Sequence, residues 1–183
     1  MRILLLIFVP WLAFSQEPAE KFWVKWNDEW TTPYQREFAD WSYHYGSHTG
    51  RGHTLLWLGK SESSWGVEVV GDGGKSLGPF QMDSTTALWV SDKMDLGILP
   101  KDIRAVLEND RSTAADMAIW YFNYWYRKHL KWLGAWQGMG LGYESIAWGR
   151  AVASYRKGYR WSEVSDDLIA LASSWVIFFK KHY

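Results

Sequence analysis

Apolar side chains recur at helical spacing over most of the chain beyond its first thirty or so residues, which predicts a mainly helical protein. The first helix should begin at the Thr-Pro pair of residues 32–33, because proline is favoured at the first helical position. Phe38, Trp41 and Tyr45 then share one face, and Gly46 with the "SHTGRG" segment should end the helix. A second helix is expected from Thr54 through "LLWLGKSES", so that it runs into Glu62.

The helical pattern is interrupted over residues 66–82. "VEVV" is β-prone, "GDGG" has the composition of a turn, and "LGPFQM" follows, which together predict a small β-hairpin. A helix should restart at Asp83 or Ser84 with "STTALWV", and a short one, "KDIRAVLEN", is expected to open at Pro100.

The clearest helix is expected from about Ser112 to Leu133. Its apolar stripe comprises Ala115, Ala118, Ile119, Phe122, Tyr126 and Leu130. A glycine-rich connection, "GAWQGMGLG", separates it from the helix "YESIAWGRAVASYRK", which should stop at Gly158. A last helix is expected to begin near Ser162 or Ser165 and to end in a basic turn. Without repeats or a linker, residues 16–183 are predicted to form one domain, mainly α with one small β-hairpin.

The N-terminus predicts export from the cytoplasm. Arg2 precedes an apolar run over residues 3–14, and the small residues Ala13 and Ser15 fit a signal peptide, residues 1–15, cleaved after Ser15. The run is short for a membrane span, which needs ~20 residues, although an uncleaved anchor is the alternative. We expect a periplasmic or secreted protein with no stable membrane span after cleavage.

Composition narrows the function further. Twenty basic and twenty acidic residues leave no net charge, so nothing predicts binding to nucleic acid. The absence of cysteine excludes disulfides, a thiol nucleophile and Cys-ligated zinc. Fifteen Trp and ten Tyr are many for a chain of 183 residues, and they predict either an aromatic core or a cleft lined with rings that stack on sugars.

The "GDGGKS" segment looks like the end of a phosphate-binding loop. That loop requires a glycine separated by four residues from the Gly-Lys-Ser group, between a strand and a helix, and Val69 occupies the position of that glycine. Pro79 also opposes a helix directly after Ser76. We therefore expect no nucleotide. The histidines His44, His48 and His53 have no metal-ligand spacing, so we expect loop histidines, no metal and no cofactor.

Glu62 is the candidate for acid chemistry. At the end of an apolar helix its carboxyl should be partly shielded from water, which raises the pKa and lets a carboxylic acid donate a proton near neutral pH. Taken alone, a single glutamate at this place favours the interpretation of a solvated or helix-capping side chain.

Three short blocks occur in an order that resembles the lytic transglycosylases. They are Glu62-Ser63, then Gly78-Pro79-Phe80-Gln81, then Ser154-Tyr155-Arg156-Lys157-Gly158. The family pattern is Glu-Ser, Gly-Leu-Met/Phe-Gln and Ala-Tyr-Asn-x-Gly, and the resemblance covers roughly residues 50–160. It implies a lysozyme-like (goose-type/lytic transglycosylase) helical domain with its hairpin beside the cleft.

The resemblance also implies roles for individual residues. Glu62 would be the sole catalytic acid and then base, Gln81 would bind substrate, Tyr155 would point its hydroxyl at the reacting sugar, and Ser63 would support the site among the substrate-binding residues. The implied reaction cleaves the β-1,4 bond between N-acetylmuramic acid and N-acetylglucosamine in peptidoglycan. The muramic C6 hydroxyl attacks C1 and leaves a 1,6-anhydro end, so no second carboxylate is needed.

Two departures from the pattern keep alternatives open. Pro79 stands where the family has Leu, and Arg156 stands where it has Asn. The alternatives are a non-catalytic glycan-binding protein on the same fold and a lysozyme-type hydrolase. We expect the nearby acids Glu68, Asp72 and Asp83 to be solvated, and one of them facing Glu62 would favour the hydrolase. Peptidoglycan strands are the expected partner of a monomeric protein.

Overall fold

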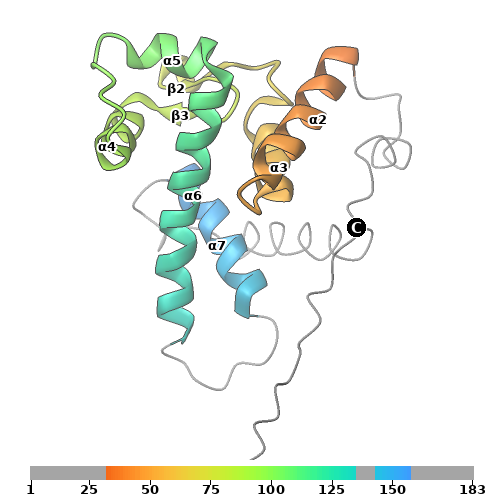
Figure 1. Cartoon of the computed structure of the whole chain (residues 1–183), viewed down its shortest axis with the longest axis vertical. Coiled ribbons are helices and arrows are strands. Elements are labelled where there is room, and N and C mark those ends of the chain that lie inside the picture. The colour runs from red at the N-terminus through yellow and green to blue at the C-terminus, as the bar shows by residue number, and fades with distance from the viewer. Residues whose placement is uncertain (1–31, 135–142, 158–183) are drawn as a thin grey trace, which may run out of the picture.

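The computed structural model describes residues 32–134 and 143–157, which contain six α-helices and three short strands (Figure 1). The predicted mainly helical class is confirmed for this part of the chain. The predicted signal peptide, the glycine-rich connection after Gly134, Gly158 and the predicted last helix lie outside the described residues.

Helices α2 (Pro33–Ser47) and α3 (Gly52–Ser63) pack side by side. The predicted start of α2 is confirmed, because Thr32 and Gln35 form a reciprocal capping box. Helix α3 begins before the expected Thr54. The Thr54 side chain is buried and accepts a hydrogen bond from Trp148 Nε1 at 3.0 Å, so it joins two helices instead of capping one.

The predicted β excursion is a three-stranded antiparallel sheet in the order β1 (Val70–Gly71), β2 (Ser76–Leu77), β3 (Met82–Asp83). Val70 pairs with Leu77, and Leu77 pairs in turn with Met82. A 3₁₀ turn, Asp72–Gly74, joins β1 to β2. The "GDGGKS" segment is therefore a turn between antiparallel strands, and a strand instead of a helix follows its lysine.

Gly78 brings the sheet close to helix α5 (Ile103–Asn109). Its φ of +74° suits glycine, and a Cβ at this position would collide with the Leu107 carbonyl oxygen. Helix α5 begins at Ile103 and not at Pro100 as expected, because residues 100–102 form a turn. Helix α4 (Ser84–Met94) starts as predicted, with Asp83 accepting backbone hydrogen bonds at its N-terminus.

The long helix α6 (Arg111–Gly134) runs through the molecule, and α7 (Tyr143–Lys157) packs against it (Figure 1). The predicted α6 stripe is buried over its first half and half-buried at Tyr126 and Leu130. The largest fully buried apolar side chains come from several helices and the sheet region: Phe38, Leu55, Leu58, Phe80, Val90, Leu107, Met117, Phe122 and Val152. Within the described ranges, no helix is both long and apolar enough to cross a membrane.

Candidate functional site

Glu62 lies in the last turn of α3, a helix that is buried on nearly all sides. Its side chain is only 8% exposed. Three consecutive residues with positive φ follow the helix (Ser64, Trp65 and Gly66), and they turn the chain away toward the sheet. The carboxyl is therefore fixed at a helix end, where the partial negative charge of the helix terminus also disfavours a carboxylate.

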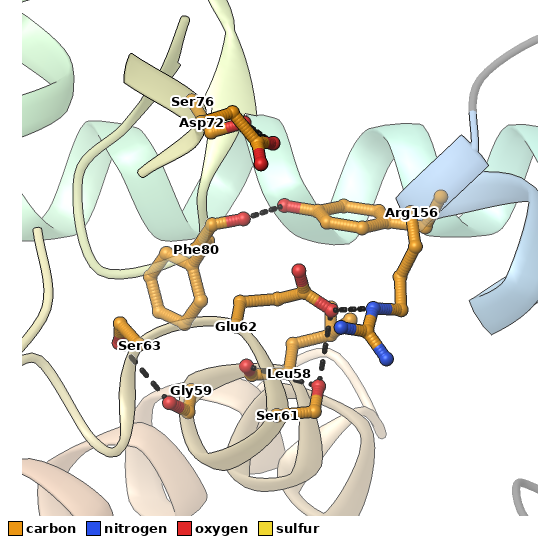
Figure 2. Close-up of polar contacts among 10 residues, drawn as sticks. Leu58, Gly59, Ser61, Glu62, Ser63, Asp72, Ser76, Phe80 and Arg156 are labelled. Atoms are coloured by element: carbon orange, nitrogen blue, oxygen red, sulfur yellow. Dashed lines mark hydrogen bonds and ion pairs between the residues drawn. The ribbon is translucent and has the colours of Figure 1, made fainter. Parts of the chain in front are cut away.

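Two side chains contact the same oxygen of Glu62 (Figure 2). Arg156 Nε lies 3.0 Å from Oε1 in an ion pair, and the Ser61 hydroxyl donates to that oxygen at 3.1 Å. The second carboxylate oxygen has no hydrogen-bond partner among the described residues and points to the side of the site where Asp72 lies. One oxygen of Glu62 is thus held, while the other is available.

Opposing influences act on the pKa of Glu62. Burial is the largest and raises the pKa, because a carboxylate in a dry site lacks its water shell. The positive charge of Arg156 and the Ser61 hydrogen bond lower the pKa, and the negative charge of Asp72 raises it. The net result is a pKa above the ordinary value, as expected from the position of Glu62 at the end of an apolar helix.

Asp72 is exposed, as predicted, but its charge reaches the site. It stands in the turn between β1 and β2 and accepts a hydrogen bond from Ser76 Oγ at 2.8 Å. Figure 2 shows the Asp72–Ser76 pair across the site from Glu62. Asp72 is therefore solvated and still close enough to Glu62 for its charge to raise the pKa of that residue. Asp72 is exposed and the Glu62 side chain is buried, so the two carboxyls are in unlike environments.

Tyr155 is buried in α7 beside Glu62, and its hydroxyl donates to the Phe80 carbonyl at 2.8 Å, a bond drawn in Figure 2. Burial and then the charge of Glu62 raise its pKa well above the ordinary value, so the phenol stays neutral. The structure brings Tyr155 and Glu62 together as the resemblance implied. The hydroxyl proton is, however, committed to the protein backbone and not directed at a reacting group.

Ser63 is 1% exposed and faces the interior. Its hydroxyl lies 2.6 Å from the Pro79 carbonyl and accepts a hydrogen bond from Gly66 N at 2.7 Å. The residue therefore ties the end of α3 to the segment between β2 and β3. Its geometry is that of a support for the site, and the burial leaves no surface for contact with a substrate.

Gln81 is half-buried and has a positive φ of 48°. Its amide nitrogen donates to the carbonyls of Glu68 and Gly78 at 2.9 and 2.8 Å, and its oxygen packs against Gly71. The side chain holds the sheet and its flanking loops together. A role in substrate binding would have to use the exposed part of this amide or follow a change of its hydrogen bonds.

Three polar contacts join the three sequence blocks. Ser63 contacts Pro79, Tyr155 contacts Phe80, and Arg156 contacts Glu62. The segment Gly78-Pro79-Phe80-Gln81 is thus held from one side by α3 and from the other by α7. Residues far apart in the chain converge around one carboxyl.

Sequence reasoning missed how Ser61 and Asp72 act on Glu62. Ser61 is adjacent to Glu62 in sequence, so a hydrogen bond from its hydroxyl to the carboxyl could have been predicted. Nothing in the sequence indicated that the Asp72 turn would bend back toward α3. The expected loop histidines are also corrected in part, because His44 lies within α2 and His53 within α3. Across residues 32–134 and 143–157, no group of three or more His, Asp or Glu side chains could hold a metal ion.

Chemically, the arrangement provides a proton at one face of the site. Glu62 has a raised pKa and one oxygen without a hydrogen-bond partner among the described residues, so its protonated form can donate to an oxygen of a bound molecule and its carboxylate can accept a proton afterwards. The Arg156 side chain is 37% exposed and adds a positive charge beside the Glu62 carboxyl.

No family model, curated protein or solved structure matches this chain. A functional assignment therefore depends on the residues and contacts described above.

Proposed function

We propose that the protein is a peptidoglycan lytic transglycosylase on a lysozyme-like helical domain, acting after export as a periplasmic or secreted enzyme. The observation that carries the proposal is the convergence of the three blocks on Glu62. Its carboxyl is 8% exposed, has a raised pKa and lies beside Tyr155. A mainly helical domain with a small sheet next to the acid is compatible with this fold class.

In the proposed reaction, protonated Glu62 donates to the oxygen of the β-1,4 bond between N-acetylmuramic acid and N-acetylglucosamine. The bond from C1 of the muramic residue to that oxygen breaks, and the muramic C6 hydroxyl forms a new bond to C1. The Glu62 carboxylate then removes the proton from that hydroxyl, which restores the acid. The attacking group belongs to the substrate, so a single carboxyl of the protein suffices.

A lysozyme-type hydrolase is the second candidate, and Asp72 is the observation that favours it. Its carboxylate stands across the site from Glu62 and is held by Ser76. Two carboxyl groups that face each other across the site are the usual machinery of glycoside hydrolysis, because one protonates the leaving oxygen and the other activates water.

A non-catalytic glycan-binding protein is the third candidate, favoured by the Arg156–Glu62 pair. An arginine in contact with the acid stabilises the carboxylate, which cannot donate a proton. This reading requires that the pair persists when a glycan is bound.

Mass spectrometry of the products from purified sacculi tests the proposal. The transglycosylase releases muropeptides with 1,6-anhydro ends. A hydrolase releases the same fragments with reducing ends, and a binding protein sediments with the sacculi and releases none. Reducing ends alone, or no release, would overturn the proposal.

A further inference from the structure

Arg156 is exposed to solvent although it contacts a buried acid. Its side chain is 37% exposed, whereas the Glu62 side chain that it contacts is 8% exposed. The contact uses Nε, and no other hydrogen bond or ion pair of Arg156 occurs within residues 32–134 and 143–157. The charged head is therefore the solvent-accessible member of the pair.

A guanidinium in this position suits a second carboxylate. Its planar fork of N–H donors matches the two oxygens of a carboxylate, and such bidentate pairs are among the stronger charge-assisted hydrogen bonds. The ion pair to Glu62 occupies the inner edge of the fork, through Nε. An incoming anion can therefore engage the remaining donors, or replace Glu62 altogether.

We propose that Arg156 binds a carboxylate on the muramic side chain of the substrate and exchanges Glu62 for it when the glycan binds. The inference rests on the proposed function and assigns a positioning and specificity role to a residue that departs from the family pattern. The carboxylate is either the free lactyl group of a peptide-free strand or a carboxylate of the attached peptide.

The exchange would convert the resting site into the reactive one. In the resting pair the charge of Arg156 lowers the pKa of Glu62, whereas with Arg156 paired to substrate the acid faces only Ser61, Tyr155 and Asp72 among the described groups. Burial and the Asp72 charge then favour protonation, and Glu62 takes a proton from solvent. A glycan without a carboxylate would leave Glu62 paired with Arg156, with a lower pKa and therefore a smaller protonated fraction.

Affinity measurements on unreactive protein test whether Arg156 contacts a carboxylate of the substrate, which the exchange requires. Glu62→Gln and Glu62→Gln/Arg156→Gln are compared by calorimetry with three oligosaccharides of equal length: peptide-bearing muramic oligomers, peptide-free muramic oligomers, and N-acetylglucosamine oligomers, which have no carboxylate. Loss of a charged hydrogen bond predicts that Arg156→Gln weakens binding by about 10-fold or more for at least one carboxylate-bearing ligand. Binding of the N-acetylglucosamine oligomer should not change.

The three ligands separate the outcomes. Weakening only for the peptide-bearing oligomer identifies a peptide carboxylate, and weakening only for the peptide-free oligomer identifies the lactyl group. Equal weakening for all three ligands, or none, overturns the exchange while leaving the proposed function standing. Failure of Glu62→Gln to bind any of the three would overturn both.

A kinetic readout distinguishes this role from a structural one. In protein with Glu62 intact, Arg156→Gln should move the alkaline limb of the kcat/KM profile to higher pH, because the resting acid loses a positive neighbour. Arg156→Lys should retain part of the preference for carboxylate-bearing ligands. Arg104→Gln breaks a comparable arginine–glutamate pair, with Glu108 on α5, and should change neither affinity nor profile. An unmoved alkaline limb in Arg156→Gln contradicts the exchange.

Discussion

The Tyr155 hydroxyl donates a 2.8 Å hydrogen bond to the Phe80 carbonyl and thereby joins α7 to the segment between β2 and β3. The bond is buried and spans much of the described chain. It places the phenol beside Glu62 and fixes how the sheet approaches α3. The same hydrogen bond of Tyr155 therefore stabilises the fold and sets the position of the sheet relative to Glu62.

Tyr155→Phe should reduce both stability and activity. The buried Phe80 carbonyl loses its donor, which costs about 1–3 kcal/mol, and the sheet is held less firmly near Glu62. Chemical denaturation and turnover of sacculi measure the two effects. The matched control is Tyr34→Phe, whose hydroxyl makes only a 3.4 Å contact with Gly66 O and should matter little. Equal effects of the two variants would show that the Phe80 bond has no special role.

Asp72→Asn should shift the pH dependence of activity. The negative charge of Asp72 raises the pKa of Glu62, so its removal lowers that pKa. Activity that needs protonated Glu62 is then lost at lower pH than in the wild type, which a kcat/KM profile records. Asp92→Asn, at an exposed acid on α4, is the control.

The products of Asp72→Asn also separate the two enzymatic candidates. A transglycosylase keeps forming anhydro ends without Asp72. If reducing ends predominate in the wild type and disappear in the variant, Asp72 activates water and the hydrolase is correct.

Glu62→Gln should stabilise the protein at neutral pH. The pKa of Glu62 is higher in the folded protein than in the unfolded chain. The folded state therefore gains stability from protonated Glu62 at a pH below the ordinary carboxyl pKa. That stability is lost as the pH rises through the folded-state pKa. The neutral amide avoids this loss. Thermal melting should show a higher Tm for the variant near pH 7, at about 2–4 °C per kcal/mol gained, and no gain near pH 4. A gain independent of pH would argue against a strained carboxylate.

Residues outside the site also give a pH-dependent stability. His129 is buried and lies 2.9 Å from Ser154 Oγ, and burial with the charges of Arg150 and Lys128 lowers its pKa to about 4. The unfolded chain binds a proton that the folded chain does not, so stability falls as the pH drops from about 6.5 to about 4. Urea denaturation should show about 2–3 kcal/mol more loss in the wild type than in His129→Gln over this interval. Parallel pH dependences would contradict the assignment.

Local chemistry explains which elements the sequence could predict. The capping groups at Thr32 and Asp83 act on neighbouring residues, so both helix starts could be predicted from the sequence. The strands are two residues long, too short for an alternating pattern, so the third strand was not foreseen. Thr54 was expected to cap a helix because Thr commonly does so, but the distant Trp148 uses its side chain instead.

In the candidate site too, features that depend on neighbouring residues could be predicted, and features that depend on distant contacts could not. The dry position of Glu62 could be predicted because it depends on the apolar helix that carries it. The Arg156 ion pair depends on how α7 packs against α3, and the influence of Asp72 depends on the path of a turn. Neither leaves a local pattern in the sequence. The hydroxyl of Tyr155 was expected to face a sugar, whereas it donates its hydrogen bond to the carbonyl of Phe80, which is distant in sequence.

The central claim is that the Glu62 carboxyl supplies the proton that cleaves a peptidoglycan strand. The most direct measurement compares release of anhydromuropeptides from sacculi by the wild type and by Glu62→Gln, together with the fraction of each protein that sediments with the sacculi. The account predicts equal sedimentation and a loss of release by about 10²–10⁴-fold in the variant, the range expected for a general acid. Release by Glu62→Gln at the wild-type rate would contradict it.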